Sequence, residues 1–133
     1  TLALRDALPS YQVLDAWVGG INTGAIDEVV GLYHDCAVLL PTFSNRRLAN
    51  SADIRGYFET LFKHDDVRVS LHEKTLVSLA LTDSVHSMSG IYCWQMEIEG
   101  DPLSFEARFS VVLNLQATAP IVHHHSSQVP RML

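Results

Sequence analysis

Two long stretches of strand-type residues, Val85–Ile98 and Leu103–Leu115, are separated by a single turn, Glu99-Gly100-Asp101-Pro102. Glycine, aspartate and proline in such a cluster predict a tight reversal of the chain. Two strands of this length joined in this way must pair antiparallel, and the apolar face that they share must be covered by other elements. The hairpin therefore constrains the fold to a sheet with one covered face.

The residues before the hairpin predict the elements that cover the sheet. Apolar residues recur at three- and four-residue intervals over Pro9–Asn22, which predicts a helix that begins with a proline. The same period predicts a second helix over Ala25–His34. A third helix is predicted from Asn50 or Ser51, either of which can cap it, to about His64.

Shorter runs predict the remaining strands. Cys36–Leu40 is a short apolar run closed by a proline, which is typical of a buried strand. Apolar and polar residues alternate over Val67–Leu71, and strand-like composition continues over Thr75–Leu81. The last strand begins after Ala119-Pro120. We therefore predict an α+β fold, in which helices cover one face of a curved and mostly antiparallel sheet.

The composition is that of one globular domain over residues 1–133. Apolar residues make up 47% and charged residues 18%, so we expect part of the apolar surface to face a partner subunit or a pocket. The net charge is −6, with nine Lys and Arg against fifteen Asp and Glu, which disfavours a nucleic-acid partner. No apolar run approaches the roughly 20 residues that span a bilayer, so we expect no membrane partner.

The two cysteines, Cys36 and Cys93, follow no CxxC spacing. This spacing predicts two free thiols rather than a disulfide framework or a thiolate metal site. We expect a cytoplasmic protein. The chain begins at Thr1 rather than at a methionine, which leaves open that a targeting segment has been removed.

A run of histidines and serines follows an apolar strand start near the C-terminus. Alternation along a strand predicts two faces, with Ile121, His123, His125 and Ser127 on one and Val122, His124 and Ser126 on the other. Each face carries imidazole and hydroxyl groups, which exchange protons and hydrogen bonds near neutral pH. Either face could therefore form a small polar site.

Two simpler interpretations of this run were weighed. The run with the following Val-Pro-Arg resembles a purification tag with a protease site. Only three histidines are present, Gln128 breaks the usual tag spelling, and the run continues an apolar strand, so the tag is disfavoured. The other interpretation is a strand end whose histidines are merely solvated.

A zinc site is a further alternative, because His123 and His125 form a His-x-His pair on one face of the predicted strand. A third ligand would have to come from His72, His86 or a carboxylate on a neighbouring strand. Since His124 faces the opposite side, the three histidines of the run cannot all bind one ion. We therefore favour a site without a metal.

Four motifs accompany the predicted order of elements. They are Val38-Leu39-Leu40-Pro41-Thr42-x-Ser44, Gly56-Tyr57-Phe58, Glu106-Ala107-Arg108-Phe109 and His123-His124-His125-Ser126-Ser127-x-x-Pro130. Over nearly the whole chain the sequence resembles the nuclear transport factor 2-like (SnoaL-like) superfamily. Within it, the sequence is most similar to the branch that holds the association domain of calcium/calmodulin-dependent kinase II and the iota-class carbonic anhydrases.

The resemblance implies a conical half-barrel that encloses a pocket, in a homodimer or higher homo-oligomer packed through the sheets. For the iota class it implies hydration of carbon dioxide without a metal or other cofactor, and a bicarbonate-like ligand. Carried onto matching positions, the implied catalytic residues are Thr42, Tyr57, His124 and Ser126. The implied substrate-binding residues are Arg108, Tyr92, His125 and Ser127.

The sequence departs from the family pattern at two places. Val129-Pro130-Arg131 stands where the family often has Met-Pro-Glu, and Ala117-Thr118-Ala119-Pro120 stands where it often has a Gly-x-Trp turn. Neither departure touches a residue assigned to chemistry.

Hydration of carbon dioxide needs a proton acceptor and donors to the growing negative charge. An imidazole such as that of His124, with an unperturbed pKa of about 6.5, could receive the proton of the attacking water. The hydroxyls of Thr42, Tyr57 and Ser126 could donate to the developing carboxylate. For Tyr57, a place on the apolar stripe of its helix is an equally good interpretation.

Two other functions fit the same fold. One is a ketosteroid-isomerase-like or SnoaL-like proton shuttle on an apolar ligand, with Tyr57 or Tyr92 as donor. It lacks a pocket-facing aspartate, because Asp83 and Asp101 belong to turns. The other is a non-catalytic ligand-binding or oligomerisation domain. Our leading hypothesis from the sequence is metal-free hydration of carbon dioxide.

Overall fold

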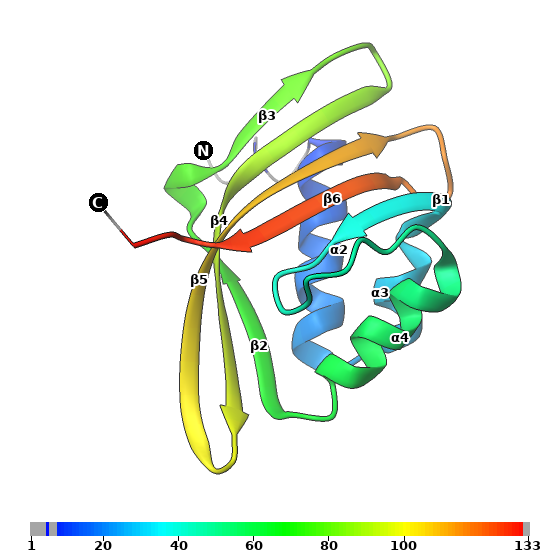
Figure 1. Cartoon of the computed structure of the whole chain (residues 1–133). Coiled ribbons are helices and arrows are strands. Elements are labelled where there is room, and N and C mark those ends of the chain that lie inside the picture. The colour runs from blue at the N-terminus through cyan, green and yellow to red at the C-terminus, as the bar shows by residue number, and fades with distance from the viewer. Residues whose placement is uncertain (1–4, 6–7, 132–133) are drawn as a thin grey trace.

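The computed structural model describes residue 5 and residues 8–131 of the chain. Three helices pack on one face of a six-stranded curved sheet (Figure 1). The helices are α2 (Pro9–Thr23), α3 (Ile26–Gly31) and α4 (Ser51–Leu61). The strands are β1 (Tyr33–Leu40), β2 (Asp65–Leu71), β3 (Val77–Ala80), β4 (Val85–Ile98), β5 (Asp101–Asn114) and β6 (Ile121–Gln128), with a 3₁₀ turn, η1 (Glu73–Thr75), before β3. The predicted α+β class is confirmed.

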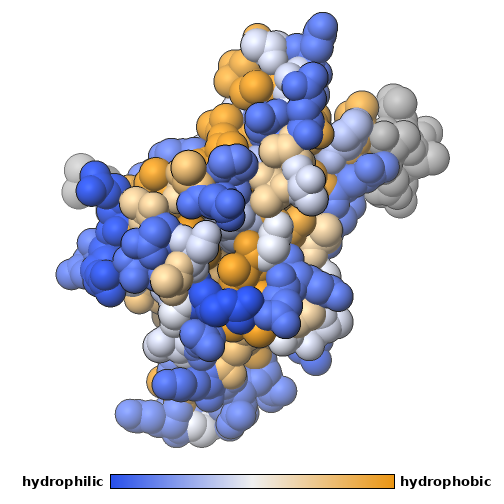
Figure 2. Space-filling view, turned by 90° about the vertical axis from the view of Figure 1, so that its right-hand side faces the viewer, coloured by the Kyte–Doolittle hydropathy of each residue, from blue (hydrophilic) through white to orange (hydrophobic). Residues whose placement is uncertain are grey.

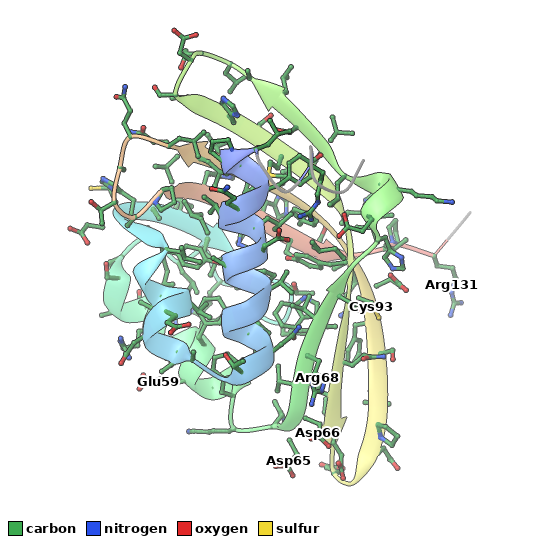
Figure 3. The ribbon with its side chains drawn as sticks, turned by 180° about the vertical axis from the view of Figure 1, so that it is seen from behind. Glu59, Asp65, Asp66, Arg68, Cys93 and Arg131 are labelled. Carbon is green, nitrogen blue, oxygen red and sulfur yellow. The ribbon has the colours of Figure 1, made fainter. Side chains whose placement is uncertain are left out.

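The sheet has the order β1-β6-β5-β4-β2, and β3 also pairs with β4. All pairs are antiparallel except β1 with β6. Seen from behind, α2 lies in front of the sheet, and the labelled Asp65, Asp66 and Arg68 mark the start of β2 beside the β4–β5 hairpin (Figure 3). The helices therefore cover one face of the sheet and leave the outer face of the central strands open.

The β4–β5 hairpin turns more tightly than the sequence predicts. Ile98 pairs directly with Asp101, so only Glu99 and Gly100 form the loop. Their φ angles are 53° and 83°, and two successive positive φ angles match the right-handed twist of the flanking strands. Asp101 and the following proline thus belong to β5, because a proline is tolerated near the start of a strand.

The predicted second helix over Ala25–His34 is too long. Helix α3 ends at Gly31, and β1 already begins at Tyr33, which pairs with Ile121 of β6. Tyr33 is buried, because this pairing places its ring inside the cone rather than on a helix surface. The local sequence fits both periods, and pairing with a distant strand decides between them.

β6 contains an irregularity that resets the predicted faces. Ile121 is buried together with His124 and Ser126, whereas His123 is exposed. The register of β5 against β6 shifts between Val112 and Leu113, which is typical of a β-bulge. The expected face of Ile121 was therefore wrong, and that of His124 and Ser126 is the inner one. Because β6 lies between β1 and β5, the run belongs to the folded sheet and is no appended tag.

Aromatic rings fill the cone between the helices and the sheet. Trp17 of α2 stacks on Tyr92 of β4 with ring centroids 5.4 Å apart, and Tyr92 stacks on Phe109 of β5 at 4.5 Å. Trp94 meets Trp17 edge-on at 5.6 Å. Such pairs contribute roughly 0.5–1.5 kcal/mol each beyond the area that they bury. This packing fixes the inner face on which the polar site lies.

Two adjacent glycines of α2 give a test of the helix packing. A Cβ at Gly20 would lie 2.7 Å from Cγ2 of the fully buried Val29, whereas a Cβ at Gly19 would meet nothing within 4 Å. We expect Gly20→Ala to lower the free energy of unfolding by about 1–3 kcal/mol through overpacking. We expect Gly19→Ala to raise it by about 0.5–1 kcal/mol through reduced chain entropy. Urea unfolding measures both, and equal shifts would contradict the close contact of α2 with α3.

Candidate functional site

Two hydroxyl groups meet at the C-terminal ends of β1 and β6. Oγ1 of Thr42 lies 2.5 Å from Oγ of Ser126. Thr42 follows β1, and β1 runs parallel to β6 with Leu40 beside His125, so the residues that follow Leu40 lie next to the end of β6. We call Thr42 and Ser126 the hydroxyl pair. Ser126 is 4% exposed, so the pair sits at the border between the core and solvent.

β4 brings two further polar groups to the hydroxyl pair. Burial raises the pKa of the Tyr92 phenol, and hydrogen bonding to Ser126 and Thr42 counteracts part of that rise. The indole of Trp94 lies close enough to Tyr92 to lower the same pKa. Yet its buried Nε1 has no partner in hydrogen-bonding geometry among the described residues. The buried Nε1–H of Trp94, which lies near the hydroxyl pair, can therefore donate to another acceptor.

His124 links the hydroxyl pair to the core through a chain of hydrogen bonds. Nε1 of Trp17 donates to the Tyr33 hydroxyl at 3.1 Å, and that oxygen lies 2.8 Å from Nδ1 of His124. Nε2 of His124 lies 3.1 Å from the Tyr92 hydroxyl. The indole of Trp17 can only donate. The polar hydrogens of Trp17, Tyr33 and His124 are therefore all paired if Tyr33 donates to Nδ1 and His124 donates from Nε2. Tyr92 is then left to donate towards Ser126.

The environment of His124 keeps its imidazole neutral. Burial, and then the charges of His123 and His125, lower the pKa of His124 to about 3. Both ring nitrogens are already engaged by tyrosines, and the residue is 3% exposed. The structure therefore places His124 as a neutral group that orients Tyr92.

An open cleft of about 300 Å³ leads to the hydroxyl pair. Its walls include the side chains of Arg46, Arg47 and Asn45 in the loop after β1. The cleft is also lined by Leu40, Pro41, Thr42, Ser44, His125, Ser126, Ser127 and Gln128. Arg47, and Arg46, which also lies 3.8 Å from Asp53, give the cleft positive charge in a chain of net charge −6, and this charge favours anions.

The structure brings together four of the predicted site residues and separates the others. Thr42, Ser126, Tyr92 and His124 form one cluster. His125 and Ser127 point to the outer face of the sheet but line the cleft. Arg108 is exposed on that outer face, where it pairs with Ser127, and it lines neither the cleft nor the pocket beside α4. The cations that line the cleft are Arg46 and Arg47.

Tyr57 contacts the backbone next to Thr42, but its hydroxyl makes no hydrogen bond with the hydroxyl pair. Its hydroxyl oxygen accepts a hydrogen bond from the backbone N–H of Phe43 at 3.3 Å, and burial raises its pKa to about 12. The ring lines a different pocket beside α4. The place expected for Tyr57 as a donor beside the hydroxyl pair is occupied by Tyr92.

Sequence reasoning missed Trp17, Tyr33 and Trp94, which complete the buried network. All three are aromatic residues with a polar tip, and in the sequence they count as core. The sequence signal that could have found them is the residue type, since Trp and Tyr usually find a hydrogen-bond partner when they are buried. Arg46-Arg47 was visible as a basic pair next to the threonine motif, but it was assigned to a polar loop.

Metal ligands do not gather within residues 5 and 8–131. No group of three or more His, Cys, Asp or Glu side chains in these residues is placed to hold a metal ion. His123 and His125, the predicted zinc pair, are both exposed on the outer face of the sheet. In the same part of the chain, none of the helices has the length and apolar character needed to cross a membrane.

Solved structures define the fold class. The chain is similar to a proposed calcium/calmodulin dependent protein kinase II association domain from Xanthomonas campestris, at 27% identity and a TM-score of 0.80, over 90% of this chain and 84% of that one. It is also similar to a proposed aromatic ring hydroxylase from Novosphingobium aromaticivorans, at 15% identity and a TM-score of 0.82, over 96% and 92%. A ketosteroid isomerase-like protein from Erwinia carotovora matches at 12% identity and a TM-score of 0.73, over 90% and 93%.

The architecture is thus the nuclear transport factor 2-like, or cystatin-like, α+β fold. The sequence matches the calcium/calmodulin dependent protein kinase II association domain family over residues 10–130. The chain therefore belongs to that family, and the superfamily predicted from its motifs is confirmed. No curated protein matches the chain.

The pKa of His124 predicts how stability depends on pH. The unfolded chain protonates this imidazole near pH 6.5, whereas the folded chain does so only near pH 3. Between these values the unfolded state binds more protons, so the free energy of unfolding rises with pH by up to roughly 1.4 kcal/mol per unit, and stability is lost as the pH is lowered towards 3. We expect His124→Gln to remove this slope and His123→Gln, an exposed control, to keep it. Urea unfolding between about pH 4 and 7 measures the slope. Loss of the slope in His123→Gln but not in His124→Gln would contradict the burial of His124.

Proposed function

We propose that this chain is a self-associating domain and that two copies pack through the outer face of the sheet. The observation that carries the proposal is an apolar stripe on β3. Val77 and Leu79 of β3 are 60% and 56% exposed and lie on one side of the strand, and Leu81, just after β3, is 55% exposed. Contiguous exposed aliphatic side chains of this kind are typical of a protein interface. Apolar residues also reach the surface near the β3–β4 end, at the top of the molecule (Figure 2).

The stripe continues across the outer face as two rows of side chains. One row runs through Leu79, Ser87, Val112, His123 and Val38. The next row runs through Val77, Ser89, Ser110, His125 and Leu40. Small serines lie in the centre of these two rows and aliphatic residues at both ends, and neither row contains Lys, Arg, Asp or Glu. Such a surface loses little charge hydration when a second copy covers it.

A charge in the centre of the second row tests the interface. Ser110 is exposed, so we expect Ser110→Arg to fold normally but to separate the copies by burying a guanidinium in the interface. Ala16→Arg adds the same charge to the exposed side of α2 and is the matched control. Analytical ultracentrifugation should find wild type and the control as oligomers and Ser110→Arg as a monomer. A monomeric wild type, or an unchanged Ser110→Arg, would overturn the proposal.

A second candidate function is metal-free hydration of carbon dioxide at the hydroxyl pair. It is favoured by one observation, the buried Nε1 of Trp94 that lacks a partner beside Tyr92. Leaving such a donor unpaired costs roughly 1–3 kcal/mol, which a bound anion would recover. The Thr42, Ser126 and Trp94 donors would stabilise the negative oxygens as water attacks the carbon.

The proton of the attacking water leaves through the cleft in this proposal. His124 is not its acceptor, because both ring nitrogens are engaged and its pKa is lowered to about 3. The imidazole of His125 is among the cleft residues and provides a route to solvent. His124 instead fixes which way the Tyr92 hydroxyl points.

Stopped-flow hydration with chelator-treated protein tests this candidate. We expect Thr42→Ala and Ser126→Ala to lower kcat by roughly 100-fold or more, because each removes a hydroxyl from the site. Ser70→Ala, which removes an exposed hydroxyl on β2 outside the cleft, should change kcat little. Wild type without activity above buffer would exclude hydration and would leave the association proposal unaffected.

A further inference from the structure

A second pocket lies between α4 and the distal end of β4. Its volume is about 530 Å³, within the range of roughly 300–1,000 Å³ that is common for small-molecule sites. It is lined by Phe43, Ser44, Arg46, Leu48, Ala52, Asp53, Gly56, Tyr57, Thr60, Leu61, His64, Met96 and Ile98. We call it the α4 pocket. It shares Ser44 and Arg46 with the cleft, but Thr42, Ser126, Tyr92 and His124 are not among its lining residues.

Small residues on α4 form one wall of the α4 pocket. Ala52, Gly56 and Thr60 follow one another at four-residue spacing, which places them on one side of the helix. A Cβ at Gly56 would meet nothing within 4 Å, so the space before this wall is open. The opposite wall includes Met96, which is 4% exposed, and the ring of Phe43. The pocket is therefore a slot with apolar walls.

Tyr57 supplies a hydrogen-bond donor at this slot. Its oxygen already accepts from the backbone N–H of Phe43, and the described residues offer no acceptor for its own hydrogen. Burial keeps the phenol protonated, since it raises the pKa to about 12. The hydroxyl is thus suited to donate to an oxygen of a ligand.

The charges at the mouth of the α4 pocket balance each other. Nη2 of Arg46 lies 3.8 Å from Oδ2 of Asp53, and both residues line the pocket. An anionic ligand would meet the Asp53 carboxylate, and a cationic ligand would meet the Arg46 guanidinium. The mouth therefore favours a neutral ligand.

We propose that the α4 pocket binds a neutral ring compound that carries a carbonyl or hydroxyl oxygen. The ring lies between the small-residue wall of α4 and the side chains of Phe43 and Met96. Its oxygen accepts the hydrogen of Tyr57. This ligand class differs from the anion that suits the hydroxyl pair, so the proposal does not depend on either proposed function.

The fluorescent probe 2-naphthol, with naphthalene-2-carboxylate as its anionic counterpart, tests the pocket. We expect saturable binding of 2-naphthol, one per chain, by wild type. Gly56→Leu fills the open space in front of the wall and should weaken binding at least tenfold. Gly19→Leu introduces the same side chain at an open position of α2 and should leave binding unchanged. Tyr57→Phe should weaken it roughly threefold to tenfold, as the loss of one hydrogen bond does.

Circular dichroism checks that each variant folds. If Gly56→Leu does not fold, Ala52→Leu on the same wall takes its place. Equal affinity of all variants for 2-naphthol, or no binding by wild type, would overturn the assignment of the pocket. Tighter binding of naphthalene-2-carboxylate than of 2-naphthol would overturn the neutral class of ligand.

Discussion

The parallel pairing of β1 with β6 is the constraint on which the rest of the structure depends. The other strand pairs are antiparallel and join neighbours along the chain or close to it, whereas this pair joins residues about ninety positions apart, as the pairing of Tyr33 with Ile121 shows. It brings the loop that holds Thr42 to the end of the strand that holds Ser126. It also turns Tyr33 into the cone, where the ring meets His124. The hydroxyl pair, the cleft and the buried network all follow from this one ladder of backbone hydrogen bonds.

The buried network is unusual in placing four polar side-chain tips inside an aromatic core. Each hydrogen bond contributes only roughly 0.5–1.5 kcal/mol net, whereas breaking one leaves a buried group unsatisfied at greater cost. The network of Trp17, Tyr33, His124 and Tyr92 therefore acts mainly to select one arrangement of the core. The chain of hydrogen bonds ends at Ser126. Packing of the core therefore fixes the orientation of a hydroxyl at the border between core and solvent.

Sequence periodicity was sufficient for the strands with two distinct faces. The bounds of β4 agree with the predicted Val85–Ile98, because alternation continues over its whole length. Periodicity failed where pairing with a distant segment decides the outcome, as at Tyr33, which fits a helix locally, and at the bulge before His123. For the site, alternation placed Ser126 and His124 on one face, but could not tell that Tyr92 rather than Tyr57 reaches them, since that depends on how the cone closes. Burial of both ring nitrogens of His124 is likewise a property of packing.

The two faces of β6 tie the proposed interface to the site. His124 and Ser126 point inward, while His123 and His125 stand in the two outer rows on either side of them. His125 also lines the cleft that leads to the hydroxyl pair. A second copy that covers the outer rows therefore comes to lie beside the mouth of the cleft. Association of two copies and access of an anion to the cleft are then coupled through β6, because each removes His125 from contact with solvent. The α4 pocket is lined by α4, the loop after β1 and the distal end of β4, and it shares Ser44 and Arg46 but no residue of β6 with the cleft, so a ligand there does not contact His125.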